Sequence, residues 1–149
     1  MFFITALLIL GLDQGTKYLV QAEMMPGQSI PIWPGVFHLT YVENPGAAFG
    51  LLANQTGFFI LVSIVVIIGV IVVYRRMARD NRWLKYGLAI QLGGAMGNLI
   101  DRIRFGHVID FFDLRVWPVF NVADMAIVVG VAILCLELLR LPSDKVETL

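Results

Sequence analysis

Four aspartates between residues 101 and 124 have a side chain suited to acid–base catalysis: Asp101, Asp110, Asp113 and Asp124. Two neighbouring carboxyl groups in a low-dielectric site cannot both ionise easily, so one keeps its proton while the other stays charged. The charged group can take a proton from water, and the protonated group can donate to a carbonyl oxygen and later to a leaving amine. This is the chemistry of an aspartic peptidase, and spacing alone does not choose the pair.

The composition indicates that a membrane surrounds these residues. Of the 149 residues, 58% are hydrophobic and 15% are charged, and the mean hydropathy is +0.81. A soluble domain needs more polar surface to cover its core, so the excess apolar area is expected to face lipid. The net charge of zero does not support nucleic-acid binding, and the single cysteine excludes a disulfide framework. We predict one membrane-embedded domain over residues 1–149.

Four segments are predicted to be transmembrane helices, at approximately 2–21, 57–74, 83–103 and 119–139. The second carries no charge and is just long enough to cross a hydrocarbon layer of about 30 Å. The first has no preceding Lys or Arg and is interrupted by Asp13 and Lys17, so we interpret it as a retained helix and not as a signal peptide. The predicted fold class is therefore an all-α integral membrane protein, a bundle of four transmembrane helices.

The distribution of basic residues predicts the orientation of this bundle. Residues 75–85 are rich in Arg and Lys, whereas the loop at 22–56 contains neither. By the positive-inside rule the basic segment is cytoplasmic, which places both termini in the cytoplasm and the loops 22–56 and 104–118 outside. Alternating β-prone residues in the first outer loop predict a small extracytoplasmic β-sheet. Residues 45–52 are expected to dip into the membrane interface.

Polar residues gather in the outer layer of the predicted bundle. Asp13 and Lys17 lie in the middle-to-outer half of the first span, and the same layer receives Asn98, Asp101, Arg102, Asn121 and Asp124. A charge inside the membrane is costly, so such residues usually face the bundle interior and mark function. The inner halves of the spans are almost purely apolar, which disfavours a proton-coupled transporter or channel subunit. A non-catalytic membrane assembly factor is the second alternative.

Five blocks in order carry a resemblance to lipoprotein signal peptidase, also called signal peptidase II: residues 13–17, 44–50, 97–102, 108–111 and 120–124. The resemblance implies an aspartic endopeptidase without metal or cofactor, with Asp110 and Asp124 as its catalytic pair. It implies cleavage of prolipoproteins just before a diacylglyceryl-modified cysteine, at the outer face of the bacterial cytoplasmic membrane. The expected partners are this lipid-modified substrate and membrane lipids, with no nucleic acid, and the chain is expected to be a monomer.

Supporting roles are expected at the other matching positions, which are Asp13, Lys17, Asn44, Gly94, Asn98, Arg102, Asn121 and Ala123. Asn121 is expected to orient a catalytic carboxylate or to cap the fourth helix. Asn98 and Arg102 share a helix face, where they would hold the substrate backbone or the loop bearing Asp110. Asp13 and Lys17, spaced i and i+4, would pair and so lower the cost of burial. Asn44 would contact substrate, and Gly94 and Gly97 permit close helix approach.

Simpler interpretations apply to the remaining polar residues. Asp101 is predicted to be a structural ion partner, and Asp113 a solvated loop carboxylate. Cys135 lies among Ile, Leu and Val and is predicted to be a packing residue. His38 and His107 lack the neighbours that a metal site requires.

Overall fold

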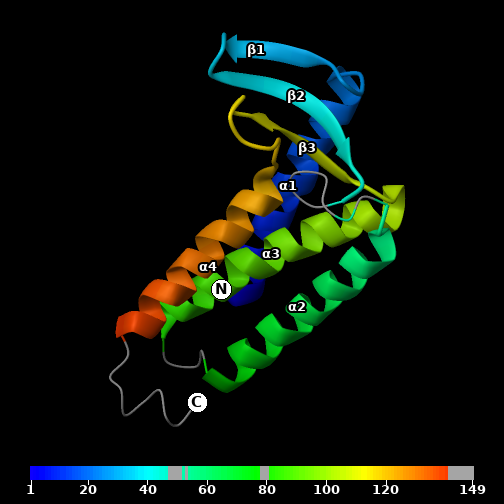
Figure 1. Ribbon diagram of the computed structural model, residues 1–149. Helices are drawn as coiled ribbons and strands as arrows, with labels where there is room; N and C mark the ends of the chain where they lie inside the picture. Colours follow the sequence, from blue (N-terminus) through cyan, green and yellow to red (C-terminus); the bar gives the residue numbers. More distant parts are fainter. Residues whose placement is uncertain (47–51, 53, 78–80, 141–149) are drawn as a thin grey trace.

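The computed structural model describes residues 1–46, 52, 54–77 and 81–140, without the side chains of Met77 and Leu138. The elements in chain order are α1 (Phe2–Glu23), β1 (Ser29–Trp33), β2 (Phe37–Asn44), α2 (Thr56–Met77), α3 (Arg82–Phe105), β3 (Val108–Asp113) and α4 (Val122–Arg140). The strands gather beyond one end of the helices (Figure 1). The chain is thus mostly helical with a small sheet, and most of the segment predicted to dip into the interface lies outside the described residues.

α3 is the central helix, because it packs against α1, α2 and α4. Glycines on α3 allow this close packing. A Cβ added at Gly93 would lie 2.6 Å from the Ala6 carbonyl oxygen of α1, and one added at Gly94 would lie 2.5 Å from the Ala123 carbonyl oxygen of α4. Small residues let helix backbones approach in this way in membrane proteins.

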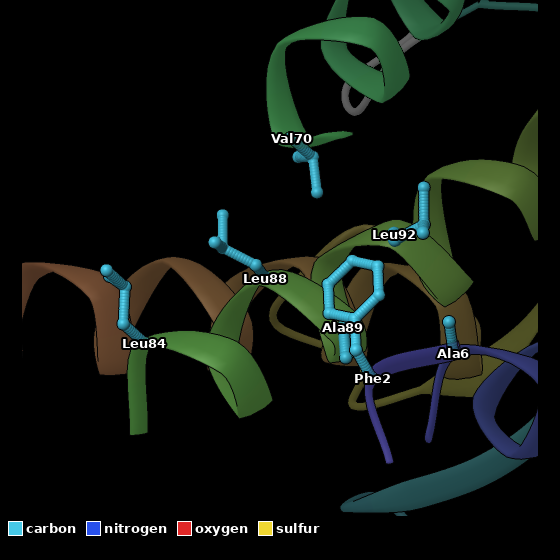
Figure 2. Packing of buried hydrophobic residues seen from close by; sticks show 7 residues of the cluster. All are labelled: Phe2, Ala6, Val70, Leu84, Leu88, Ala89 and Leu92. Atoms are coloured by element: carbon cyan, nitrogen blue, oxygen red, sulfur yellow. The ribbon is translucent and has the colours of Figure 1, made fainter. Parts of the chain in front are cut away.

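The core of the helices joins α1, α2 and α3 near the N-terminus of the chain. Figure 2 shows its members, which are Phe2, Ala6, Val70, Leu84, Leu88, Ala89 and Leu92. The Phe2 ring also stacks on Tyr74 of α2, with ring centroids 3.7 Å apart. These contacts attach α2 to the rest of the bundle near the end opposite the sheet.

The outward faces of the helices are apolar and exposed. Large hydrophobic side chains are exposed along α1, α2 and α4, and examples are Leu8, Leu61, Ile68 and Val128. A soluble monomer rarely exposes contiguous apolar surface on this scale. Within the described ranges two helices, α1 and α2, are long and apolar enough to cross a membrane.

The sheet is antiparallel with the strand order β1-β2-β3. We predicted strands only within residues 22–56, and the prediction did not include the third strand, β3, which lies within residues 104–118. β3 pairs with β2, which is distant in sequence, and Ile109 and Phe111 of β3 pack with Val20 of α1. Val, Ile and Phe favour strands, but a segment of six residues is not stable as a strand by itself, so the pairing with β2 and the packing on α1 decide its conformation.

The start of the fourth helix also differs from the prediction. α4 begins at Val122 and not near residue 119, because Phe120 forms a β-bridge with Phe112 of β3 and Asn121 caps the helix. The ends of the other three helices lie within three residues of the predicted spans. The bridge brings the first turn of α4 beside the strand that carries Asp110.

We predict that Gly94→Ala lowers the thermal unfolding midpoint of the protein in detergent. The new methyl group would overlap the Ala123 carbonyl, and such overpacking costs about 1–3 kcal/mol. Gly11→Ala is the matched control, since a Cβ there meets nothing within 4 Å. Equal midpoints for the two variants would contradict the close approach of α3 and α4.

Candidate active site

Asp110 is positioned by the alternation of β3. Ile109 and Phe111 point into the apolar core beneath the sheet, whereas Val108 and Asp110 line a cavity on the other side. Successive side chains of a strand point to opposite faces, so burial of the two apolar residues directs the carboxyl group into the cavity.

Asp124 is positioned by the cap of α4. The Asn121 side-chain oxygen accepts the backbone N–H of Asp124 at 2.9 Å, and the Asp124 carboxylate accepts the backbone N–H of Asn121 at 3.2 Å. This reciprocal arrangement satisfies two backbone donors at the helix start. The side-chain amide of Asn121 also donates to Asp110 Oδ1 at 2.7 Å. One fully buried asparagine therefore binds both aspartates, combining the two roles expected for it as alternatives.

Two further asparagines complete the hydrogen bonding of the carboxyl groups. Asn44, at the end of β2, donates to Asp110 Oδ2 at 2.9 Å. Asn98 of α3 donates to Asp124 Oδ1 at 2.8 Å. Each oxygen of the two carboxyl groups thus accepts one N–H. The amide of Asn44, which was expected to contact substrate, is directed at Asp110 in this structure.

The environment of Asp110 favours its protonated form. Burial is the largest influence, and together with the nearby charge of Asp124 it raises the pKa of Asp110 to about 7, against the lowering effect of the hydrogen bonds from Asn44 and Asn121. Asp110 can therefore hold or release a proton near neutral pH. Such a carboxyl group beside a second carboxylate has the properties of an acid–base pair.

A cavity of about 460 Å³ opens onto both aspartates. Its polar end contains the two carboxyl groups together with Asn44, Asn98 and Arg102. The remainder is mostly apolar, with Ser63 and Gln91 as its polar members. Its apolar lining includes Phe59, Val62, Val66, Ala95, Ile127 and Val128 from α2, α3 and α4. The site can therefore accept a molecule with one polar part and one apolar part.

Arg102 lies on the cavity one helical turn from Asn98. Its guanidinium donates to the Gly46 carbonyl oxygen at 3.4 Å, and its Cζ lies 5.0 Å from the centroid of the Phe59 ring. Arg102 thereby connects α3 with the segment after β2 and with α2. Its expected role, to hold the substrate backbone or the segment bearing Asp110, stays a prediction.

Behind the two aspartates lies a buried ionic cluster. The Lys17 ammonium is 2.9 Å from Asp13 Oδ2 and 2.7 Å from Asp101 Oδ2. The pairing of Asp13 with Lys17 and the structural role of Asp101 agree with the predictions, although the partner of Asp101 is Lys17. Sequence reasoning missed Gln14, which donates to Asp101 Oδ1 at 2.9 Å. The sequence signal that could have identified Gln14 is its position inside the block of residues 13–17, which carries the family resemblance.

Two predictions about the remaining polar residues were wrong. Asp113 is buried and not solvated, because it accepts hydrogen bonds from Thr40 and Arg115 at 2.8–2.9 Å. Cys135 is exposed on α4 and does not pack in the core.

His107 lies 3.7 Å from Glu43. In the described part of the chain no three His, Cys, Asp or Glu residues are grouped to hold a metal ion.

The chain is similar to known bacterial proteins over nearly its whole length. A model of the family described as signal peptidase (SPase) II matches residues 5–140. The chain is 56% identical over 144 residues to the lipoprotein signal peptidase of Moorella thermoacetica, covering 97% of this chain and 95% of the relative. It is 50% identical over 143 residues to that of Pelotomaculum thermopropionicum, covering 96% and 93%.

A solved structure of a bacterial membrane enzyme superposes with a TM-score of 0.90 at 31% identity, covering 97% of this chain and 90% of the other. A second, also described as a bacterial membrane enzyme, superposes with a TM-score of 0.85 at 31% identity, covering 93% and 92%. These relationships favour the peptidase interpretation over the transporter and assembly-factor alternatives. The chain belongs to the signal peptidase II family of bacterial membrane peptidases.

Proposed function

We propose that this protein is an aspartic endopeptidase that removes the signal peptide from diacylglyceryl-modified prolipoproteins by cleaving just before the lipidated cysteine. The observation that carries the proposal is the pair Asp110 and Asp124, held on the single Asn121 cap at the polar end of a largely apolar cavity. Relatives named lipoprotein signal peptidase support this choice of substrate.

In the proposed mechanism Asp124 is the base and Asp110 the acid. Ionised Asp124 takes a proton from water as the water oxygen bonds to the scissile carbonyl carbon, and Asp110 gives its proton to the carbonyl oxygen. Asp124 then protonates the amide nitrogen as the C–N bond breaks, and a hydroxyl of the tetrahedral intermediate returns a proton to Asp110. The products are the carboxyl end of the signal peptide and the free amine of the lipidated cysteine. The raised pKa of Asp110 supports this assignment.

The position of the cavity suits a substrate that remains anchored in lipid. Its walls are formed by apolar side chains of α2, α3 and α4, while Asp110 is supplied by the sheet outside the helices. An acyl chain can stay among the apolar side chains while the peptide bond reaches water. Anchoring of this kind holds the reacting bond near the aspartates and lowers the entropic cost of the reaction.

All four helices are proposed to span the bacterial cytoplasmic membrane, with both termini in the cytoplasm and the site at the outer face. The shortest helix, α4, has 19 residues and is about 28 Å long at 1.5 Å per residue, close to the hydrocarbon thickness. The charged groups of Asp13, Lys17 and Asp101 are buried against one another, as a membrane environment requires. A single chain supplies every residue of the site, and we propose a monomer without a metal or cofactor.

Asp110→Asn and Asp124→Asn should each lower turnover of a lipid-modified prolipoprotein by about 10²–10⁴-fold or more, because each removes one acid–base group. The assay follows cleavage by the purified full-length protein in detergent. Asp113→Asn is the matched control, since this aspartate lies in the same strand but binds Thr40 and Arg115. Wild-type turnover in Asp110→Asn or in Asp124→Asn would refute the proposed function. Inhibition of the wild-type protein by a chelator would indicate a metal.

The activity should decline as pH rises through about 7. Asp110 has a raised pKa and acts in its protonated form, so ionisation above that pH removes the acid. Asn44 donates a hydrogen bond that lowers this pKa, so Asn44→Ala should move the decline to higher pH. The measurement is kcat/KM between about pH 5 and about pH 9. A rise in kcat/KM through neutral pH would contradict the assignment of Asp110 as the acid.

The proposed orientation is testable by thiol labelling in a Cys135→Ala background. Val116→Cys introduces a thiol at an exposed position before α4, and Arg82→Cys introduces one at the exposed start of α3. A membrane-impermeant maleimide should label Val116→Cys in intact cells and Arg82→Cys only after lysis. The opposite pattern would reverse the topology.

A further inference from the structure

We propose that Lys17 is a positioning residue for Asp110 and Asp124. Its ammonium group makes three hydrogen bonds, and through them it holds the neighbours of the two aspartates in place. This inference rests on the proposed function of Asp110 and Asp124. Lys17 does not line the cavity, and it is 2% exposed. Its action must therefore pass through other side chains.

The first connection runs from Lys17 through Asn98 to Asp124. The ammonium donates to Asn98 Oδ1 at 2.9 Å, and Asn98 Nδ2 donates to Asp124 Oδ1 at 2.8 Å. An ammonium group can only donate, so it forces the oxygen of the Asn98 amide to face it. The amide nitrogen must then face Asp124. The side-chain amide of Asn121 also donates to Asn98 Oδ1, at 3.1 Å, so the ammonium is the shorter of two donors that fix this orientation. Without Lys17 one neutral donor is left to hold the Asn98 amide in place.

The second connection runs through Asp13 to the start of α4. Asp13 Oδ2 binds Lys17, while Asp13 Oδ1 accepts the backbone N–H of Ala123 at 2.9 Å. Ala123 directly precedes Asp124. The ion pair therefore anchors the backbone from which the Asp124 side chain projects.

The third connection runs through Asp101 to β3. Asp101 Oδ2 binds Lys17 at 2.7 Å and also accepts the backbone N–H of Ile109 at 3.2 Å. Ile109 directly precedes Asp110. The three ammonium donors thus lead to the residues next to both aspartates and to the amide that binds Asp124. A displacement of about 1 Å in such a site is enough to cost about 10²-fold in rate.

The test separates positioning from folding with two variants. Lys17→Met leaves Asp13 and Asp101 as two buried carboxylates without a cation, which is expected to lower the unfolding midpoint. The double variant Lys17→Met/Asp13→Asn loses one cation and one anion together. The summed charge of positions 13, 17 and 101 therefore returns to the wild-type value of −1. The double variant should therefore recover much of the midpoint, whereas the ammonium donor to Asn98 is absent and the 3.1 Å hydrogen bond from Asn121 is left to orient that amide.

We expect kcat to fall by about 10²-fold in both variants, with KM changed by less than about threefold because the cavity lining is intact. Lys85→Met, the same change on an intermediate-exposure lysine of α3 far from the site, is the control and should retain wild-type kcat. Recovery of kcat together with the midpoint in the double variant would overturn the proposal. So would wild-type kcat in Lys17→Met.

A further variant keeps the inference testable if neither Lys17 variant folds. Asn98→Asp retains an oxygen for Lys17 but has no N–H to donate to Asp124, so kcat should again fall by about 10²-fold with the ionic cluster still in place. Wild-type turnover in Asn98→Asp would overturn the proposal. Asp110→Asn and Asp124→Asn are measured in the same assay. Because these two variants test the catalytic aspartates directly, they distinguish a failure of the Lys17 proposal from a failure of the proposed function.

Discussion

The ammonium group of Lys17 is buried among helices whose outward faces are apolar, and this constraint organises the site. A buried charge is costly unless opposite charges and hydrogen bonds surround it. Asp13 from the same helix and Asp101 from α3 supply those partners at 2.7–2.9 Å. The second interactions of the two carboxylates, with the backbone of α4 and of β3, then bring distant segments of the chain to one place.

The polar layer and the apolar bundle depend on each other. α3 can approach α1 and α4 closely because glycines face both neighbours, and that approach places Asn98 beside Asp124. α2 packs on α3 and α1 near the opposite end, through Val70 and the stacked Tyr74. Near the aspartates α2 contributes one wall of the cavity. A site that is polar at one end and apolar at the other suits a peptide attached to a lipid.

Much of the fold could be predicted from the sequence because the signals are local. Apolar runs mark helices to within about three residues at most ends, and charges within those runs mark the polar layer. The predictions failed where contacts between distant segments decide the outcome. β3 is a strand because it pairs with β2 and packs on α1, and Asp113 is buried because that pairing brings Thr40 beside it. Cys135 resembles the apolar residues around it, and periodicity did not show that it faces outward.

The sequence by itself determined the membrane character, the helices and a short set of acidic candidates, since composition and apolar length act residue by residue along one segment. It also carried the five blocks from which the family could be inferred. Only the tertiary structure decided which groups contact one another. Asp110 and Asp124 come from a strand and a helix, and they meet because Asn121 caps that helix and reaches the strand at the same time. Such a contact depends on the relative placement of two elements, which no local pattern encodes.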